Sequence, residues 1–411
     1  MRKNEIFKMK TKNKIVIIGG GVAAMMLAAE LDSDLFDINI YEKGIGLGRK
    51  FLVAGKGGFN LTHSEPKETF IGRYEPSSFL KPFIEQFNNN DLRKWLENAG
   101  IPTMIGSSKK IYPVKGIKPV EVLNAIKGKL RDNNVKLHYN HEFIDISSSG
   151  KPVFKHGDLR TVITADIVVF ALGGASWKVT GSDGKWIDIL AKAGVETIGF
   201  EPSNCAFKVD WSESFLSKNE GKPLKNITTY KKGKTVKGEL MITGFGLEGG
   251  AIYAMSGLLR KELNEKGKTD ILIDLKPNLR SKEIENKFKI LSGAKSITNI
   301  LKQYIKLDKT KIDLIKNYTT KEEFKDIKKL SSVIKNLKVN ISGIAEIDEA
   351  ISTVGGISLN AVDQNMKIKS LPYHYAIGEM LNWDAPTGGY LLQASFSMGY
   401  SLASHLNQKF G

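Results

Sequence analysis

Cysteine is almost absent from this chain, which has 411 residues and only Cys205. A single thiol excludes an intrachain disulfide, a Cys-x-x-Cys redox pair and a zinc knuckle, and such scarcity is typical of a reducing cytoplasm. No apolar run approaches the length of a membrane span, and no internal repeat or low-complexity tract is present. The histidines lack metal-ligand spacing, so no metal site is expected. What remains is a globular chain long enough for two or three domains.

Acidic residues are also in deficit. Lys and Arg number 61 against 44 Asp and Glu, which gives a formal net charge of +17. One interpretation is a polyanionic partner, RNA above all, because Lys and Arg neutralise phosphates. The other is that Lys simply serves as the preferred solvating residue in a chain where Lys greatly outnumbers Arg. Both interpretations stay open at the level of sequence.

The N-terminus imitates a signal peptide, because a basic stretch precedes an apolar run. Glycines interrupt that run, and a strand explains it better than a secretion signal does. We therefore expect residues 1–13 to form a flexible basic tail and the protein to be cytoplasmic.

The most informative segment is 14–31, KIVIIGGGVAAMMLAAEL. Its β-branched run predicts a buried parallel strand that enters a glycine turn and a helix. Gly19, Gly21 and Ala24 occupy the three small-residue positions of a dinucleotide fingerprint, which serve a tight turn, a close approach to pyrophosphate and helix–strand packing. Glu42 ends the next strand, where a carboxylate accepts ribose hydroxyls. Strand, turn, helix and terminal acid in this order predict a dinucleotide-binding unit.

Three later segments also contain glycine-rich turns that could contact a dinucleotide. A glycine-dense loop with Arg49, Lys50 and Lys56 follows Glu42, and such loops fold over phosphates and flat rings. A second buried strand, 166–172, runs into Gly173 and Gly174. A last strand near 373–377 reaches a Gly-Glu pair, and a glycine turn then feeds a terminal helix.

The middle of the chain has a different residue pattern. Short alternating runs in 196–280 predict an antiparallel barrel or sandwich, and 281–340 is Lys-rich with helical periodicity. We therefore expect a discontinuous nucleotide-binding domain formed by 14–195 and 341–411, with a β-rich substrate domain and a small helical insertion between its halves. This topology would place a substrate cleft between the nucleotide domain and the insert.

Several blocks together resemble one family. They are IIGGGVAAMMLA, YEKGIGLGRKFLVAGKGGFNLTH, ALGGASWKVTGSDG, GELMITGFGLEGGAIYAMS, TVGGISL and AIGEMLNWDAPTGGYLLQASFSMG, and they run from the first strand to the last helix. The chain resembles the two-dinucleotide-binding-domain flavoproteins and, more narrowly, the BaiN/RdsA (YhiN-like) FAD-dependent oxidoreductases. The resemblance implies an α/β fold with a Rossmann-type FAD-binding domain, an inserted antiparallel β-barrel and a small helical domain.

The resemblance also implies which residues contact FAD. Phe143 would offer backbone contacts to adenine, and the terminal helix would aim its positive end at the flavin N1–C2=O edge. The implied cofactor-binding residues are Gly19, Gly21, Ala24, Glu42, Lys43, Gly48, Arg49, Lys50, Asn60, Thr62, Phe143, Gly173, Gly378, Glu379, Thr387, Gly388, Gly389 and Tyr390.

No catalytic residue is assigned. Many family members carry Gly-Arg-Cys-Asn where this chain has Gly57-Gly58-Phe59-Asn60, so the arginine and cysteine are missing. Cys205 is interpreted as a small buried residue, and His63 as a loop residue rather than an acid. No second Gly-x-Gly-x-x-Gly lies in 196–340, so NAD(P)H, as a candidate electron donor, would dock directly at the flavin.

Three functions follow as hypotheses. The first is an FAD-dependent oxidoreductase that transfers hydride at flavin N5 and reduces a uridine C5=C6 bond in ribosomal RNA, with the basic insert on the phosphates. The second is an FAD- and NAD(P)H-dependent reductase of a conjugated small molecule. The third is a flavin-bearing binding protein without catalysis. The substrate and the oligomeric state are not fixed by the sequence.

Overall fold

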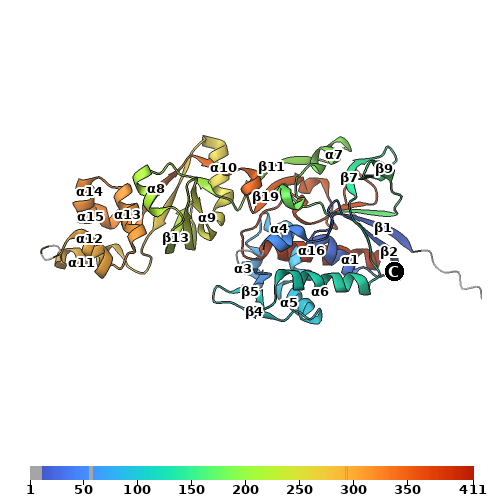
Figure 1. The fold of residues 1–411 in the computed structure, drawn as a ribbon, viewed down its shortest axis with the longest axis horizontal. Helices are drawn as coiled ribbons and strands as arrows, with labels where there is room; N and C mark the ends of the chain where they lie inside the picture. The colour runs from blue at the N-terminus through green and yellow to red at the C-terminus, as the bar shows by residue number, and fades with distance from the viewer. Residues whose placement is uncertain (1–11, 55–58, 292, 294) are drawn as a thin grey trace, which may run out of the picture. The chain divides into compact units, whose positions relative to one another are not determined.

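The computed structural model describes residues 12–54, 59–291, 293 and 295–411 (Figure 1). It divides into two compact units, one reaching to Glu201 and resuming over Thr353–Gly411, the other formed by Pro202–Ser352. The chain passes between the units along the paired strands β11 (Thr197–Ser203) and β19 (Ser352–Ile357). Most of the expected N-terminal tail lies outside the described residues. No described helix combines the length and apolarity needed to span a bilayer.

A five-stranded parallel sheet forms the centre of the first unit, in the order β20-β10-β1-β2-β6. The side chains of Ile15, Val16 and Ile17 are fully buried, as expected of strands covered on both faces. The strands are β1 (Asn13–Ile18), β2 (Phe36–Tyr41), β6 (Lys136–His138), β10 (Ile167–Phe170) and β20 (His374–Ala376).

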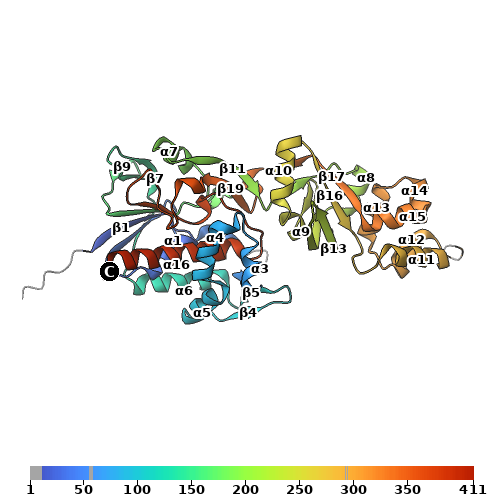
Figure 2. The same ribbon diagram turned by 180° about the vertical axis from the view of Figure 1, so that it is seen from behind.

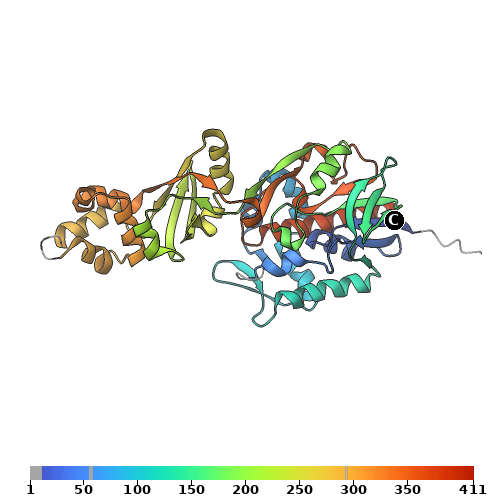
Figure 3. The same cartoon turned by 45° about the horizontal axis from the view of Figure 1, so that its top comes forward.

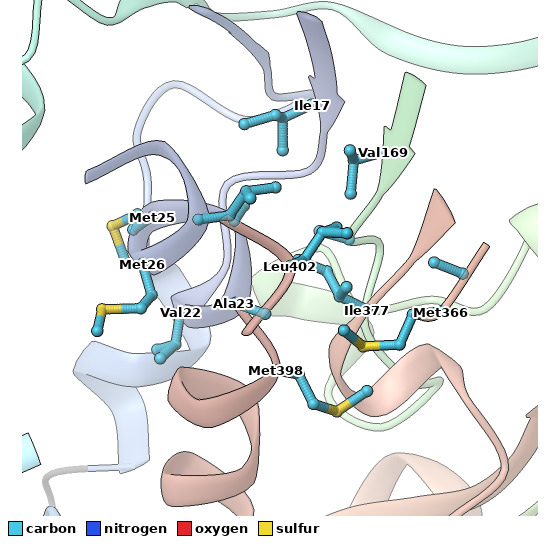
Figure 4. Packing of buried hydrophobic residues seen from close by; sticks show 14 of the residues in the cluster. Ile17, Val22, Ala23, Met25, Met26, Val169, Met366, Ile377, Met398 and Leu402 are labelled. Atoms are coloured by element: carbon cyan, nitrogen blue, oxygen red, sulfur yellow. The ribbon is translucent and has the colours of Figure 1, made fainter. Parts of the chain in front are cut away.

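Helix α1 (Val22–Glu30) and the terminal helix α16 (Tyr390–Phe410) pack closely against each other, as Figures 1 and 2 both show. Gly399 permits this contact, because a Cβ at that position would lie 2.5 Å from the carbonyl oxygen of Ala23. In the buried core, Ala23, Met398 and Leu402 gather with Ile17 of the sheet (Figure 4). The first and last thirds of the chain therefore share one core.

Shorter elements surround this core. Two small antiparallel sheets have the orders β3-β5-β4 and β7-β8-β9. Their strands are β3 (Thr62–His63), β4 (Thr103–Ile105), β5 (Lys110–Pro113), β7 (Glu142–Ile146), β8 (Pro152–His156) and β9 (Leu159–Val162). The helices are α2 (Arg49–Ala54), α3 (Lys67–Ile71), α4 (Ser77–Gln86), α5 (Asn89–Asn98), α6 (Pro119–Asp132) and α7 (Trp186–Lys192).

The second unit is built on an antiparallel sheet in the order β17-β16-β13-β14-β15-β12-β18. Its two outermost strands, β17 (Leu337–Ile341) and β18 (Gly343–Ile344), are consecutive in the chain. The continuous stretch 337–344 therefore pairs with β16 through β17 and with β12 through β18. These pairings join the two ends of the sheet, so it closes into the predicted barrel. The remaining strands are β12 (Phe207–Lys208), β13 (Pro223–Lys231), β14 (Lys234–Ile242), β15 (Gly246–Glu248) and β16 (Thr269–Asp274).

The helices of the second unit share a core with its barrel. Ile284 and Phe288 of α11 and Ile334 of α15 are buried in the same hydrophobic cluster as Ile271 and Ile273 of β16. The helical insertion expected at 281–340 is therefore packed on the barrel within one unit, seen in Figure 3. Its helices are α11 (Ser281–Leu291), α12 (Ile297–Asn299), the π-helical turn Ile300–Tyr304, α13 (Lys309–Asn317), α14 (Lys321–Lys325) and α15 (Ile327–Lys335), preceded in the chain by α8 (Glu213–Asn219), α9 (Gly250–Tyr253) and α10 (Ser256–Lys266).

A buried histidine on β20 predicts a pH-dependent stability. Burial lowers the pKa of His374 below its ordinary value, so the unfolded chain takes up a proton more readily than the folded protein. The stability present at neutral pH is then lost as the pH falls below about 6.5. His374→Phe keeps a ring against Phe170. Between about pH 7 and 5, the free energy of unfolding measured by urea titration should fall less in this variant than in the wild type. The control His156→Gln changes an exposed ring, and an equal effect of both variants would contradict this account.

Candidate dinucleotide-binding site

The candidate site lies at one edge of the parallel sheet. Because β1, β2, β10 and β20 run in the same direction, their carboxyl ends meet there, which is where open α/β sheets bind ligands. Gly19 follows β1, Glu42 follows β2, Gly173 lies beyond β10 and Gly378 beyond β20. Residues separated by more than 300 positions in the sequence are thereby gathered at one edge.

The glycine turn after β1 has the geometry expected of a phosphate-binding turn. Gly19 adopts a φ of +101°, and a Cβ there would lie 2.5 Å from the carbonyl oxygen of Ala171. Gly21 is the N-cap of α1, which has no side-chain cap and no acid in its first turn. A Cβ on Gly21 would meet no atom of the described residues within 4 Å. The positive end of α1 therefore faces open space, while Ala24 is fully buried in the helix packing.

Backbone hydrogen bonds hold the carboxylate of Glu42 in place. Its Oε2 accepts from the amide of Gly20 and its Oε1 from the amide of Gly44, both at 2.7 Å. A carboxylate oxygen has two lone pairs, so each oxygen can accept a further hydrogen bond. The next residue, Lys43, forms an ion pair with Asp183 at 3.1 Å.

The loop after β2 is tied to the other strand ends. The amide of Gly48 donates to the carbonyl of Gly20 at 2.9 Å. Arg49 donates to the carbonyl of Val179 at 3.0 Å. Lys50 donates to Ser176 at 3.0 Å and pairs with Glu379 at 3.1 Å. The family resemblance assigns both Lys50 and Glu379 to the cofactor site, but no sequence signal indicates that they form an ion pair.

The start of α16 lies against the predicted Asn60–Thr62 segment. Gly389, the N-cap of α16, has a φ of +96°, and a Cβ there would lie 2.5 Å from the Cα of Thr62 and 2.8 Å from Nδ2 of Asn60. Thr387 and Gly388 form the turn that precedes this cap. The helix start again has neither a side-chain cap nor an acid in its first turn.

Sequence reasoning missed a partly buried polar cluster next to this helix start. The hydroxyl of Tyr390 donates to Glu65 at 2.8 Å, and Arg73 binds both oxygens of the same carboxylate. Burial raises the pKa of Glu65, but the hydrogen bonds from Arg73 and Tyr390 outweigh it, so the pKa lies below its ordinary value. Burial and Glu65 raise the pKa of Tyr390, which keeps its hydroxyl a donor. The only sequence signal was an acid three residues after Thr62.

His63 lies beside this cluster, with its ring 5.4 Å from that of Tyr390. Its Nδ1 accepts from the amide of Glu65 at 3.2 Å. Burial lowers the pKa of His63, so the ring is neutral at pH 7. A neutral ring that accepts at Nδ1 fits a structural role in the loop better than that of an acid.

Removing the Tyr390 hydroxyl should destabilise the protein measurably. Tyr390→Phe deletes a hydrogen bond to a charged carboxylate, which is expected to cost about 1.5–3 kcal/mol of unfolding free energy. Urea denaturation measures this loss. The control Tyr373→Phe alters a ring that is 60% exposed and should have little effect, so equal losses in both variants would argue against a contribution from the cluster.

The other named residues lie as follows. Phe143 belongs to β7, is buried, and its ring lies 5.4 Å from that of Phe170. Gly173 has a φ of +72°, and its carbonyl accepts from Trp186 at 3.1 Å. Gly378 accepts from Trp383 at 2.9 Å.

Three further points bear on the chemistry. Lys56, Gly57 and Gly58 lie outside the described residues. Cys205 is buried in the second unit. Within the described ranges, no cluster of three or more His, Cys, Asp or Glu side chains could hold a metal ion.

Comparisons with known proteins agree with this geometry. The chain is 24% identical over 407 residues to a 3-dehydro-bile acid delta(4,6)-reductase of Clostridium scindens, covering 94% of this chain and 97% of the relative. It is 22% identical over 405 residues to a ribosomal RNA dihydrouridine synthase of Haemophilus influenzae, covering 96% and 98%. A 3-ketosteroid delta1-dehydrogenase from Sterolibacterium denitrificans shares the fold with a TM-score of 0.51 at 14% identity, over 97% and 100% of the two chains.

The reductase and the dehydrogenase are oxidoreductases by name, the enzyme class predicted for this chain. The predicted family resemblance and the Rossmann-type fold are confirmed by a family model described as "HI0933-like protein Rossmann domain", which matches residues 13–405. The chain therefore belongs to the HI0933-like Rossmann family.

Proposed function

We propose that the protein is an FAD-dependent oxidoreductase that reduces a carbon–carbon double bond, with a uridine of ribosomal RNA as substrate. The observation that carries the cofactor assignment is the pairing of two features at the sheet edge. At the start of α1, Gly21 has no side-chain cap, and an added Cβ there would meet no described atom within 4 Å. The carboxylate of Glu42, held by two backbone amides, directly follows the neighbouring strand β2. A dinucleotide needs a helix start for its pyrophosphate and an acid for its ribose.

The residues around this edge divide the work of holding FAD. The amides of the Gly19–Gly21 turn would bind the pyrophosphate, and Glu42 would accept the ribose hydroxyls. The start of α16 at Gly389 would direct its positive end toward the flavin. When bound, FAD supplies hydride transfer. The ion pair between Lys50 and Glu379 links the loops on either side of the edge.

The substrate is proposed from the relatives and the charge. Two relatives, from Haemophilus influenzae and Escherichia coli, are named ribosomal RNA dihydrouridine synthases. Dihydrouridine is uridine whose C5=C6 bond has gained one hydride and one proton. NAD(P)H is proposed as the donor of the hydride, and solvent as the source of the proton. The net charge of +17 suits a phosphate-rich substrate.

A second candidate is the reduction of a conjugated small molecule. The Clostridium scindens relative is named a reductase of a bile acid and is slightly more identical to this chain than the two synthases. A flavin that is rapidly reoxidised by an enone in the absence of RNA would favour this candidate. A flavin that NAD(P)H never reduces would favour a binding protein without catalysis.

Nucleoside mass spectrometry of ribosomal RNA from a deletion strain tests the proposal. We expect dihydrouridine to be lost on deletion and restored by the wild-type gene. The Gly21→Ala gene should not restore it, whereas Gly199→Ala, which changes an exposed glycine whose added Cβ meets no atom within 4 Å, should. An unchanged nucleoside profile in the deletion strain would overturn the assignment of the substrate.

A further inference from the structure

The positive charge of the chain is concentrated in one segment. Residues 276–338, here named the basic helical cluster, contain seventeen Lys and Arg against seven Asp and Glu. This segment alone supplies ten of the seventeen excess positive charges of the chain. A uniform preference for Lys would place only about three of them there. The concentration favours a local cause over a bias of the whole composition.

Most acidic side chains of the cluster accept hydrogen bonds from backbone amides at the N-termini of helices. Asp308 and Asp326 are the N-caps of α13 and α15 and accept backbone amides. Glu323 completes the capping box of α14. Glu283 binds the backbone and the side chain of Arg280. These carboxylates stabilise the helix starts. Lys335 and Lys338, at the end of the cluster, pair with Asp274 and Asp270 of β16.

The densest group of lysines lies on α14 and α15. Lys321, Lys325, Lys328 and Lys329 are all exposed, and none forms an ion pair among the described residues. Lys321 and Lys325 are four residues apart and therefore share one face of α14.

Two of these lysines occupy positions that oppose the helix dipole. Lys328 and Lys329 lie in the first turn of α15, directly after the cap Asp326. A cation is unfavourable at a helix start, where the backbone already carries partial positive charge. Their placement adds positive potential at the surface at some expense of helix stability, which suits the capture of an anion.

The surroundings favour a nucleic acid over a membrane. A helix that lies on a bilayer inserts an apolar face, but the apolar residues Leu330 and Ile334 of α15 are buried. Among the described residues of the cluster, Ile290 is the only large hydrophobic side chain that is mostly exposed. The charge is carried by Lys rather than Arg, and Lys contacts phosphates as a point charge without the planar fork that reads base edges.

We propose that the basic helical cluster binds the phosphate backbone of the RNA substrate independently of its sequence, while the choice of the modified base is made elsewhere. This inference rests on the proposed function, because it assigns a surface to the same substrate. It predicts an affinity that falls steeply with salt and differs little between sequences of equal length.

Fluorescence anisotropy of the FAD-loaded, full-length protein tests the proposal. The probes are labelled single-stranded RNAs of about 30 nucleotides, one oligouridylate and one of mixed sequence, in about 100 mM KCl. The variant changes Lys321, Lys325, Lys328 and Lys329 to Gln, which preserves helix propensity. We expect its affinity for both probes to fall at least about ten-fold and the salt dependence to become shallower.

A matched variant removes the same charge from the other unit. It changes Lys81, Lys94, Lys155 and Lys192, all exposed and without ion pairs among the described residues, to Gln. Its affinity should change less than about two-fold, and a Lys-to-Arg version of the first variant should retain binding. Equal losses in the two Gln variants would show that only net charge matters and would overturn the proposal.

The remaining outcomes separate this inference from the proposed function. If the wild type binds vesicles of phosphatidylglycerol but neither RNA probe, the RNA assignment of the cluster is wrong. If deletion of the gene abolishes dihydrouridine while the variant at α14 and α15 binds RNA as the wild type does, the reaction stands and the cluster has no part in it. If the Lys-to-Gln variant at α14 and α15 loses RNA affinity while its flavin absorbance is unchanged, the proposal is supported.

Discussion

Gly21→Ala is expected to yield a protein that folds normally but binds FAD much more weakly. The φ of Gly21 is −78°, and within the described part of the chain an added Cβ would meet no atom within 4 Å. Because alanine is a poorer N-cap than glycine, the folding cost should be about 1 kcal/mol or less. The methyl group would, however, occupy the space in which the pyrophosphate approaches the backbone. We expect FAD affinity to fall on the order of 100-fold, or about 2.7 kcal/mol.

Flavin fluorescence quenching measures that affinity, and circular dichroism checks the fold. Gly199→Ala is the matched control, because an added Cβ at Gly199 also meets no described atom within 4 Å and Gly199 is an exposed residue of strand β11. Wild-type FAD affinity in Gly21→Ala would mean that the pyrophosphate does not pass over this turn.

The second large effect is expected at Glu42. Glu42→Ala removes the acceptor of the Gly20 and Gly44 amides, which are both at 2.7 Å from the carboxylate. Leaving two partly buried amides without a partner should cost about 1–3 kcal/mol of unfolding free energy. The ribose would also lose its acceptor, so FAD binding should be too weak to survive purification.

Asp37→Ala is the control for this prediction, since Asp37 lies on β2, the strand that Glu42 follows. Its carboxylate pairs with Lys136, whose side chain is 60% exposed, and losing such a surface pair should cost no more than about 1 kcal/mol. The purified control should remain yellow. A yellow and equally stable Glu42→Ala protein would remove Glu42 from the cofactor site.

The turn after β1 could be predicted because its signals are local. The apolar strand, the three small residues and the acid of the next strand all fall within about thirty residues, and each has a defined position in a βαβ unit. The alternation in 196–280 likewise predicted antiparallel strands. In both segments, local pattern and final environment agree.

Long-range pairings could not be predicted. Tyr390 meets Glu65 across 325 positions and Lys50 meets Glu379 across 329, and nothing in the sequence identifies which acid a given donor will reach. The second unit of the structure spans Pro202–Ser352, whereas the sequence pattern suggested an insert over 196–340, because β17 and β18 complete the barrel before the chain returns to the first unit. Which strand closes a sheet is decided by tertiary packing rather than by the local pattern.

The direct test of the central claim is an FAD titration of purified, folded protein, followed by its visible absorption and by flavin fluorescence. The sheet edge described here predicts a yellow protein that retains one FAD per chain, or that regains it when FAD is added to the stripped form. A folded protein that is colourless and fails to bind added FAD would contradict the account.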